Sequence, residues 1–223
     1  MKKIIIAIDG PAASGKTTTA KIVAETLGYL FLDTGAMYRA IALAALREGI
    51  ESDEAKIETL IKNIKIDVKP SGTGQLTFLN GEDISLAIRE PEVTKWSSPI
   101  SAYRAVREAM VDLQRQIGKD GGIIVDGRDI GTTVFPDAEL KFYVVASVVE
   151  RAKRRTKELN AAGKNVTFDE IRNELLERDK RDSSREISPL KKADDAIVLD
   201  TSEMTIQEQS QLIIEKAKEI IYN

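Results

Sequence analysis

The sequence predicts an α/β fold in which helices flank a five-stranded parallel sheet. Five short apolar runs alternate along the chain with segments whose apolar residues recur at helical spacing, and this alternation is typical of parallel strands joined by crossover helices. Near the middle of the chain, two short runs alternate apolar and polar residues instead, which indicates a small antiparallel β insert. A glycine-containing loop directly after the first strand favours ligand binding at the carboxyl end of the sheet.

The first elements are a strand, a loop and a helix in immediate succession. Residues 3–8 form an apolar, β-branched run, and residues 16–27 carry apolar side chains at helical spacing. Gly28 suits the end of that helix, because glycine adopts the left-handed backbone at no steric cost. Ser52 is expected to be the N-cap of a later helix. The next strand and two helices are expected at residues 29–32, 36–47 and 52–61.

The pattern changes after this third helix. Residues 64–69 and 75–79 alternate apolar and polar side chains, as half-exposed strands do. Turn-forming residues at 70–74 separate the two runs, and Asn80-Gly81 predicts a tight turn after the second. A short helical stretch is expected at 83–88 before the chain returns to the main sheet.

The rest of the chain resumes the α/β alternation. Helices are expected at about residues 101–117, 147–159, 168–181 and 206–221, and strands at residues 123–125, 140–145 and 197–199. We therefore expect a core domain of residues 1–33 and 101–223. A second domain, residues 34–100, would contain the antiparallel insert at about residues 63–95.

Residues 10–17 carry the pattern G-x-x-x-x-G-K-[ST] between the first strand and the first helix. That is the context of a phosphate-binding loop (P-loop), in which backbone N–H groups and the helix N-terminus surround phosphate oxygens. In such a P-loop NTPase-type fold, Lys16 would reach the β- and γ-phosphates of a nucleoside triphosphate, and the Thr17 hydroxyl would bind Mg²⁺. The alternative is a glycine-containing turn that binds nothing, and the flanking strand and helix argue against it.

The composition restricts the chemistry. The chain has 223 residues, a formal net charge of −3, no cysteine and no histidine. It therefore has no general basic field for nucleic acid, and no thiolate nucleophile or histidine base. Phosphoryl transfer is the large reaction class that works with the residues that remain. We also expect a cytoplasmic protein without a membrane span, because no segment approaches the roughly 18 apolar residues that a span requires.

Polar residues cluster just past the carboxyl ends of two further strands. Asp33-Thr34-Gly35 follows the second strand, with Tyr38 and Arg39 about one helical turn later, and residues 126–129 (Asp-Gly-Arg-Asp) follow the third. Such strand ends line the ligand crevice of an open α/β sheet. An acid at the end of an apolar strand is the expected partner of a P-loop Mg²⁺, directly or through water, which makes Asp126 a candidate. The alternative is a turn-forming aspartate before glycine.

Two charged helices carry arginines that could grip phosphate. Guanidinium groups bind phosphate oxygens through paired hydrogen bonds and stabilise charge on a transferring phosphoryl group. Alone, such charged runs are more often solvated faces with ion pairs inside the helix, but a P-loop in the same chain reverses that preference. In the first helix, spacings of three and four residues predict one shared face for Arg151, Arg154 and Arg155. In the second helix, the same spacings predict one shared face for Arg178, Arg181, Asp182 and Arg185.

Several long motifs in the same order resemble the bacterial cytidylate kinase family, one of the nucleoside monophosphate kinases. They are residues 8–17 (Ile-Asp-Gly-Pro-Ala-Ala-Ser-Gly-Lys-Thr), 33–39 (Asp-Thr-Gly-Ala-Met-Tyr-Arg), 126–132 (Asp-Gly-Arg-Asp-Ile-Gly-Thr) and 178–190. The resemblance runs essentially end to end, and the antiparallel insert is similar to the extension that marks this group. It implies ATP-dependent phosphorylation of CMP or dCMP to CDP or dCDP, Mg²⁺ as cofactor, and a helical lid at about residues 151–168 that closes over ATP.

The resemblance also implies roles for single residues. ATP would be bound by Gly10, Pro11, Ala12, Ala13, Ser14, Gly15, Lys16, Thr17, Thr18 and Arg151. CMP would be bound by Thr34, Tyr38, Arg39, Ser98, Arg107, Arg128, Asp129, Arg178, Asp182 and Arg185. Within that set, cytosine would be read by Ser98, Arg107 and Asp129, and the sugar held by Arg178 and Asp182. The residues implied in catalysis are Lys16, Arg128, Arg155 and Arg185.

Other functions stay open from the residues alone. The nearest is a small P-loop kinase that acts on UMP, AMP or a small metabolite. A GTPase switch would need an N-K-x-D motif after a strand, and a motor ATPase usually has Asp-Glu where this chain has Asp126-Gly127. A nucleotide-binding module without catalysis would not require the arginine-rich helices. The expected partners are nucleotides only (ATP, CMP and dCMP), bound by a monomer.

Overall fold

A five-stranded parallel sheet forms the centre of the molecule, in a computed structural model that describes residues 2–72 and 74–222. The strand order is β2-β6-β1-β7-β8, and every neighbouring pair is parallel. The strands are β1 (Ile5–Asp9), β2 (Leu30–Asp33), β6 (Ile123–Gly127), β7 (Leu140–Val145) and β8 (Ile197–Asp200). The predicted fold class and its five strands are confirmed.

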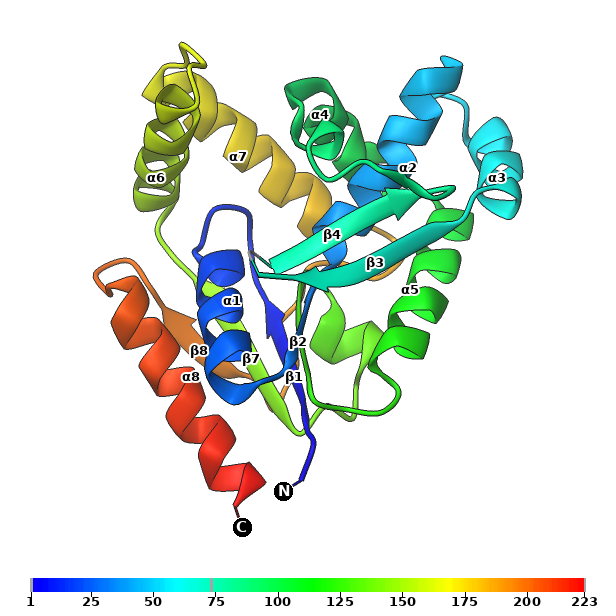
Figure 1. The fold of residues 1–223 in the computed structure, drawn as a ribbon. Helices are drawn as coiled ribbons and strands as arrows, with labels where there is room; N and C mark the ends of the chain where they lie inside the picture. Colours follow the sequence, from blue (N-terminus) through cyan, green and yellow to red (C-terminus); the bar gives the residue numbers. More distant parts are fainter. Residues whose placement is uncertain (1, 73, 223) are drawn as a thin grey trace.

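Helices cover both faces of this sheet (Figure 1). The main ones are α1 (Lys16–Leu27), α2 (Thr34–Glu48), α5 (Arg104–Gly118) and α8 (Ile206–Ile221). Helices α1 and α8 pack on one face and α2 and α5 on the other, so an apolar core lies on each face of the sheet. Successive residues of β1 enter the two cores in turn, since Ile6 lies in the first and Ala7 in the second. A strand buried on both faces explains the unbroken apolar run before the P-loop.

The expected antiparallel insert is present as a separate three-stranded sheet in the order β3-β4-β5. Its strands are β3 (Ile66–Ser71), β4 (Gly74–Leu79) and β5 (Glu82–Asp83), between α3 (Glu54–Asn63) and the 3-10 turn η1 (Ala87–Arg89). The predicted tight turn at Asn80-Gly81 forms, with positive φ angles of 51° and 88°. Helix α4 (Pro91–Ile100) then packs along α2 and leads back to the core.

Two helices form an arm beside the P-loop. They are α6 (Val148–Ala161) and α7 (Phe168–Ser183), and they pack on each other (Figure 1). Their own apolar core contains Ala152, Ile171 and Leu175, and the P-loop residues Ala12 and Ala13 pack against it. The arm therefore rests directly on the loop. The division into domains and the lid bounds stay predictions.

Three sequence-based expectations are wrong in detail. The third helix begins at Glu54 rather than Ser52, because the side chain of Asp53, not of Ser52, accepts from the N–H of Lys56. Helix α5 begins at Arg104 rather than at residue 101, because α4 continues to Ile100 and a turn separates the two helices.

The third difference is the helical stretch expected at 83–88. Asp83 instead pairs with Phe78 as part of β5, and its carboxylate accepts from the N–H and hydroxyl of Ser85. That local turn competes with a helix, so only the 3-10 turn η1 follows. Thr73 of the expected turn, and the ends of the expected core domain at Met1 and Asn223, lie outside the described residues. No described helix has the length and apolar character needed to cross a membrane.

Candidate active site

The P-loop closes tightly between β1 and α1. Gly10 has a φ of 146°, and a Cβ there would lie 2.0 Å from the carbonyl oxygen of Val144. Gly15, at the start of α1, has a φ of 94°, which an L side chain rarely adopts. These two positions require glycine, so the loop can keep its N–H groups turned toward a phosphate.

Lys16 lies buried at the centre of the loop. Its ammonium donates to the carbonyl of Pro11 at 2.6 Å and lies 3.4 Å from the hydroxyl of Ser14. Burial, together with the nearby Arg128, lowers the pKa of Lys16 to about 7. Phosphate oxygens placed in the loop would favour the charged form and restore that pKa.

Three predicted residues meet where β2 and β6 end. The hydroxyl of Thr17 donates to the carboxylate of Asp126, and the hydroxyl of Thr34 donates to the Asp126 carbonyl at 2.7 Å. Burial raises the pKa of the Asp126 carboxyl. A hydroxyl and a carboxylate in contact at the end of a P-loop suit Mg²⁺, which takes one or two protein oxygens and fills its other positions with water and phosphate. Thr18 is exposed on the following turn of α1.

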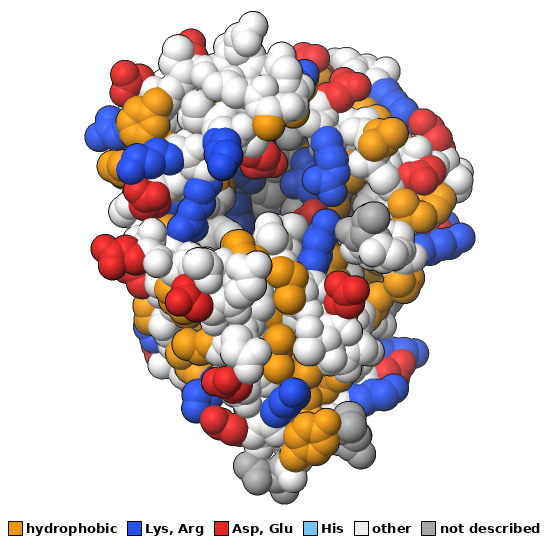
Figure 2. Space-filling model, turned by 60° about the vertical axis from the view of Figure 1, so that its left-hand side comes forward, with side chains coloured by type: hydrophobic (Ala, Val, Ile, Leu, Met, Phe, Trp, Pro, Cys, Tyr) orange, Lys and Arg blue, Asp and Glu red, His pale blue; other side chains and the backbone are white. Residues whose placement is uncertain are grey.

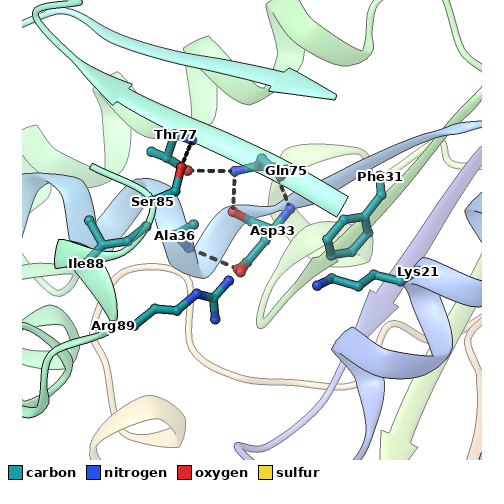
Figure 3. A pocket seen from close by; sticks show the side chains of 9 residues that line it. All are labelled: Lys21, Phe31, Asp33, Ala36, Gln75, Thr77, Ser85, Ile88 and Arg89. Carbon is teal, nitrogen blue, oxygen red and sulfur yellow. Dashed lines mark hydrogen bonds between the residues drawn. The ribbon is translucent and has the colours of Figure 1, made fainter. Parts of the chain in front are cut away.

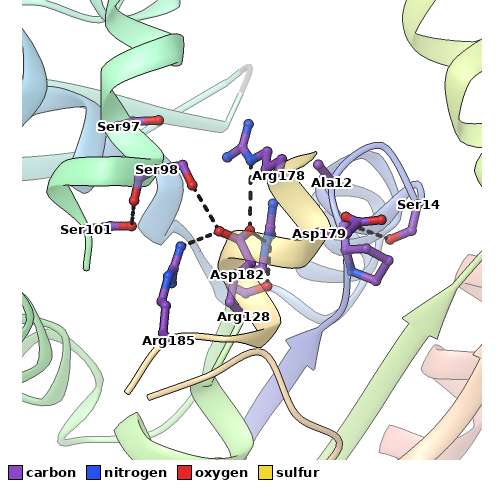
Figure 4. Close-up of polar contacts among 12 residues, drawn as sticks. Ala12, Ser14, Ser97, Ser98, Ser101, Arg128, Arg178, Asp179, Asp182 and Arg185 are labelled. Carbon is purple, nitrogen blue, oxygen red and sulfur yellow. Dashed lines mark hydrogen bonds and ion pairs between the residues drawn. The ribbon is translucent and has the colours of Figure 1, made fainter. Parts of the chain in front are cut away.

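A single carboxylate, that of Asp182, gathers three of the arginines predicted to bind phosphate or sugar, together with Ser98, which was predicted to read cytosine (Figure 4). It accepts from Arg128 at 3.1 Å, from the hydroxyl of Ser98 at 3.1 Å, and from Arg185. Arg178 lies 3.8 Å away. These residues come from α4, the end of β6, and α7 with the segment after it, so the cluster, here named the Asp182 cluster, ties three distant parts of the chain together.

The charges of the Asp182 cluster influence one another strongly. Burial and the neighbouring Arg128 lower the pKa of Arg178 to about 10. Burial acts to raise the pKa of Asp182, but Arg128, Arg185 and Arg178 outweigh it and hold that pKa below its usual value. The cluster therefore stays ionised at neutral pH, with more positive than negative charge.

A second buried pair lies beside this cluster. Arg107 donates to Asp129, and both side chains are at most 5% exposed. The guanidinium lies 5.5 Å from the ring centroid of Tyr38. The Tyr38 hydroxyl is buried near the side chain of Gln114 and makes no hydrogen bond of normal geometry within the described residues. A buried donor and acceptor pair next to an unsatisfied hydroxyl leaves hydrogen-bonding capacity for a polar ligand such as a base edge.

Arg39 is held by the acid that caps its own helix. Asp33 accepts from the N–H of Ala36 at 3.0 Å and from Arg39 at 3.0 Å. The backbone N–H of Asp33 in turn donates to the side chain of Gln75 in the insert at 2.9 Å (Figure 3). That contact borders a small pocket lined by Lys21, Phe31, Asp33, Ala36, Gln75, Thr77, Ser85, Ile88 and Arg89. The pocket is separate from the Asp182 cluster.

The three arginines of α6 have different hydrogen-bond and ion-pair partners. Arg151 is buried, donates to the Ala12 carbonyl of the P-loop at 3.2 Å, and pairs with Asp179 of α7 at 2.6 Å. Arg154 donates to Thr201, whose hydroxyl donates to the Ser14 carbonyl at 2.9 Å. Arg155 instead pairs with Glu158 at 2.9 Å on its own helix. Arg151 therefore contacts the loop directly and Arg154 through Thr201, and the shared role predicted for the three arginines stays a prediction.

Most residues singled out from the sequence therefore lie at this end of the sheet, and their roles in binding and catalysis stay predictions. On α7, Arg181 is exposed and lies outside the Asp182 cluster, contrary to the predicted four-residue face. The contacts of Asp9, Asp179 and Thr201 were not predicted. Asp9 had one signal in the sequence, since it ends a buried strand immediately before Gly10.

These residues define the class of protein. The buried lysine of the P-loop and the arginines of the Asp182 cluster lie at the same end of one parallel sheet, and Figure 2 shows Lys and Arg side chains around a hollow in one face. One half can hold the phosphates of a donor nucleotide and the other the phosphate of an acceptor. The arrangement is that of a P-loop kinase.

Comparison with known proteins identifies the family to which the chain belongs. The family model described as cytidylate kinase matches residues 6–219, so the chain belongs to the cytidylate kinase family. It is 50% identical to the cytidylate kinase of Bacillus pumilus over 98% of each chain, and 50% identical to that of Bacillus thuringiensis over 96% of this chain and 95% of the relative. The family resemblance predicted from the motifs is confirmed.

Solved structures support the fold. An uncharacterized protein from Eubacterium ventriosum aligns with a TM-score of 0.53 at 14% identity, covering 96% of this chain and 98% of its own. Shikimate kinase from Bacteroides thetaiotaomicron aligns with a TM-score of 0.50 at 11% identity, with both chains covered completely. At these identities the likeness concerns the fold alone.

Proposed function

We propose that this protein transfers the γ-phosphoryl group of ATP to the phosphate of CMP, giving ADP and CDP, and that it also accepts dCMP. The observation that carries the proposal is the Asp182 cluster, which presents arginines at the same sheet edge as Lys16. A nucleotide switch or a binding module needs the P-loop but has no use for this second cationic site. Family membership narrows the acceptor to a cytidine monophosphate.

The P-loop is the donor side. The ATP phosphates take the place of the Pro11 carbonyl as the partner of Lys16, and Arg151 holds the loop against α6 and α7. Thr17 and Asp126 are the residues that would hold Mg²⁺. When bound, this ion supplies charge neutralisation on the ATP phosphates.

On the acceptor side, different residues contact the phosphate, the sugar and the base of the monophosphate. Arg128, Arg185 and Arg39 grip the phosphate, and Thr34 lies at the same strand end. Asp182 and Arg178 hold the sugar, with the Asp182 carboxylate accepting from ribose hydroxyls. Ser98, Arg107 and Asp129 read cytosine through hydrogen bonds to its polar edge, and they line the same buried region.

The reaction needs no general base. The acceptor is a phosphate oxygen that is already anionic near neutral pH, because the second ionisation has a pKa of about 6. Catalysis is then positioning plus charge stabilisation by Lys16, Arg128 and Arg185, with Arg155 joining when the arm formed by α6 and α7 closes. Closure excludes water, which would otherwise hydrolyse ATP.

The experiment that tests the proposal is an acceptor panel with ATP as donor in a coupled ADP assay. CMP and dCMP are expected to give the highest kcat/KM, and UMP, AMP and shikimate much lower values. ADP release that does not depend on any nucleoside monophosphate would contradict the proposal, and preference for UMP or AMP would correct the acceptor.

A further inference from the structure

Asp129, the acid proposed to read the base, lies at the start of a short helical turn. Asp129 directly precedes the π-helical turn η2 (Ile130–Val134). The first N–H groups of any helical turn lack partners inside it, and an aspartate at the preceding position usually accepts from them. Among the described residues the Asp129 side chain makes no such cap contact, and one of its carboxylate oxygens instead accepts from Arg107. The turn therefore needs an acceptor from elsewhere.

Asp9 supplies that acceptor from the last position of β1. Its two carboxylate oxygens accept from the N–H groups of Ile130 and Gly131, both at 2.8 Å. The side chain is only 5% exposed. Burial raises the pKa of Asp9 to about 7, although the two backbone hydrogen bonds act to lower it, and removing a partner from a buried N–H group leaves that group unsatisfied. Since Gly10 follows Asp9 directly, a single side chain joins the start of the P-loop to the segment that carries Arg128 and Asp129.

We propose that Asp9 is a positioning residue for the acceptor base, because it caps the turn η2 and so leaves Asp129 free to pair with Arg107 and face cytosine. The inference rests on the proposed base-reading role of Asp129 and Arg107. The contacts of the Asp9 carboxylate in the structure are to the backbone of η2. Asp9 acts by fixing the backbone from which Asp129 projects.

The opposite end of the same turn offers a matched control. Arg115 of α5 donates to the carbonyls of Thr133 and Val134, at 2.8 Å and 3.0 Å. Asp9 and Arg115 thus hold the two ends of one turn, and only the end held by Asp9 carries Asp129. A purely structural role predicts similar consequences from losing either contact. A positioning role predicts that the two losses differ in their effect on CMP.

The test compares Asp9→Asn with Arg115→Gln in the full-length protein. Asparagine keeps the size of the side chain but turns an NH₂ group toward one of the two N–H groups. Asp9→Asn is expected to raise KM for CMP by about tenfold, the effect of losing one buried hydrogen bond. It should also reduce the CMP-over-UMP preference and change KM for ATP about threefold at most. Arg115→Gln is expected to lower Tm while leaving KM for CMP and the preference unchanged.

Two further variants keep the inference testable. If Asp9→Asn does not fold, Gly131→Ala replaces it, since a Cβ at Gly131 would lie 3.4 Å from the Asp9 carboxylate and 3.1 Å from Lys141; it should shift the same preference in the same direction. Asp129→Asn tests the base-reading role itself. If Asp129→Asn alters the CMP-over-UMP preference and neither Asp9→Asn nor Gly131→Ala does, the role of Asp9 is wrong. If Asp129→Asn leaves the preference unchanged, the base-reading role is wrong, and the inference about Asp9 fails with it.

Discussion

The donor and acceptor sides of the site are built in different ways. The donor side is built mainly from eight consecutive residues, Gly10 to Thr17, and Lys16 bonds to the Pro11 carbonyl five residues away. The acceptor side brings together residues such as Ser98 and Asp182, which lie 84 positions apart in the chain. A site made by one loop needs only local geometry, whereas a site made of distant charges needs those charges to be paired correctly. The two sides should therefore respond differently to substitution.

The largest effect is expected on the donor side. Lys16→Ala should lower kcat by about 10²–10³-fold or more, because a preorganised positive charge on the transferring phosphoryl group is lost. The fold should survive, since Ser14 still donates to the Pro11 carbonyl at 3.1 Å. Steady-state kinetics and a thermal melt would measure both. Near-normal turnover would contradict the donor role of Lys16.

The next effect should separate the two sides. Asp182→Asn removes the charge that holds the arginines, and KM for CMP should rise about thirtyfold or more, since disrupting a buried charge pair costs at least ~2 kcal/mol. KM for ATP should change little. Asp195→Asn is the matched control, because Asp195 is exposed and pairs with Lys141, outside the Asp182 cluster. Equal losses for ATP and CMP would mean that the two sides are not independent.

A smaller effect is expected where the insert meets the core. Gln75→Leu leaves the backbone N–H of Asp33 without its acceptor and should lower the free energy of unfolding by about 1 kcal/mol, seen as a Tm lower by a few degrees. Gln211→Leu, on the exposed face of α8, loses only a pairing with Glu215 and serves as the control. If both variants melt at the wild-type temperature, the Gln75 contact contributes nothing to stability.

The smallest effect concerns pH. The arginines hold the pKa of Asp182 below its usual value, so ionised Asp182 stabilises the fold above about pH 4, the ordinary aspartate value, and this contribution is lost as pH falls through the lowered pKa. The wild type should therefore lose its stability advantage over Asp182→Asn only in acid. Denaturant melts between pH 3 and pH 7 would measure the difference. An advantage that stays constant down to pH 3 would contradict this account.

The sequence was most informative where contacts are local. The periodicity of the apolar residues and the positions of the glycines mark where the strand before Gly10 ends and where the helix from Lys16 begins. The position of the donor loop could therefore be predicted from the local sequence pattern alone. The contact of Thr17 with Asp126 also followed, because the carboxyl ends of parallel strands meet at one edge of a sheet.

Long-range contacts could not be predicted in this way. Helical spacing grouped Arg178, Arg181, Asp182 and Arg185, but it cannot say which edge of α7 faces the cleft, and Arg181 turns to solvent. The contact of Asp182 with Ser98 depends on how α4 packs against α7. The capping of η2 by Asp9 joins segments about 120 residues apart, and no local pattern encodes such a pair.

The charge count of the Asp182 cluster has a consequence for selectivity. Three guanidinium groups and one carboxylate leave two positive charges in excess, and a monophosphate near neutral pH carries between one and a half and two negative charges. A monophosphate therefore brings the pocket close to electrical neutrality. With a nucleoside bound, the net charge of the pocket stays positive. With a triphosphate bound, the net charge becomes negative. By this balance, the acceptor side would sort nucleotides by their number of phosphates before the base is read.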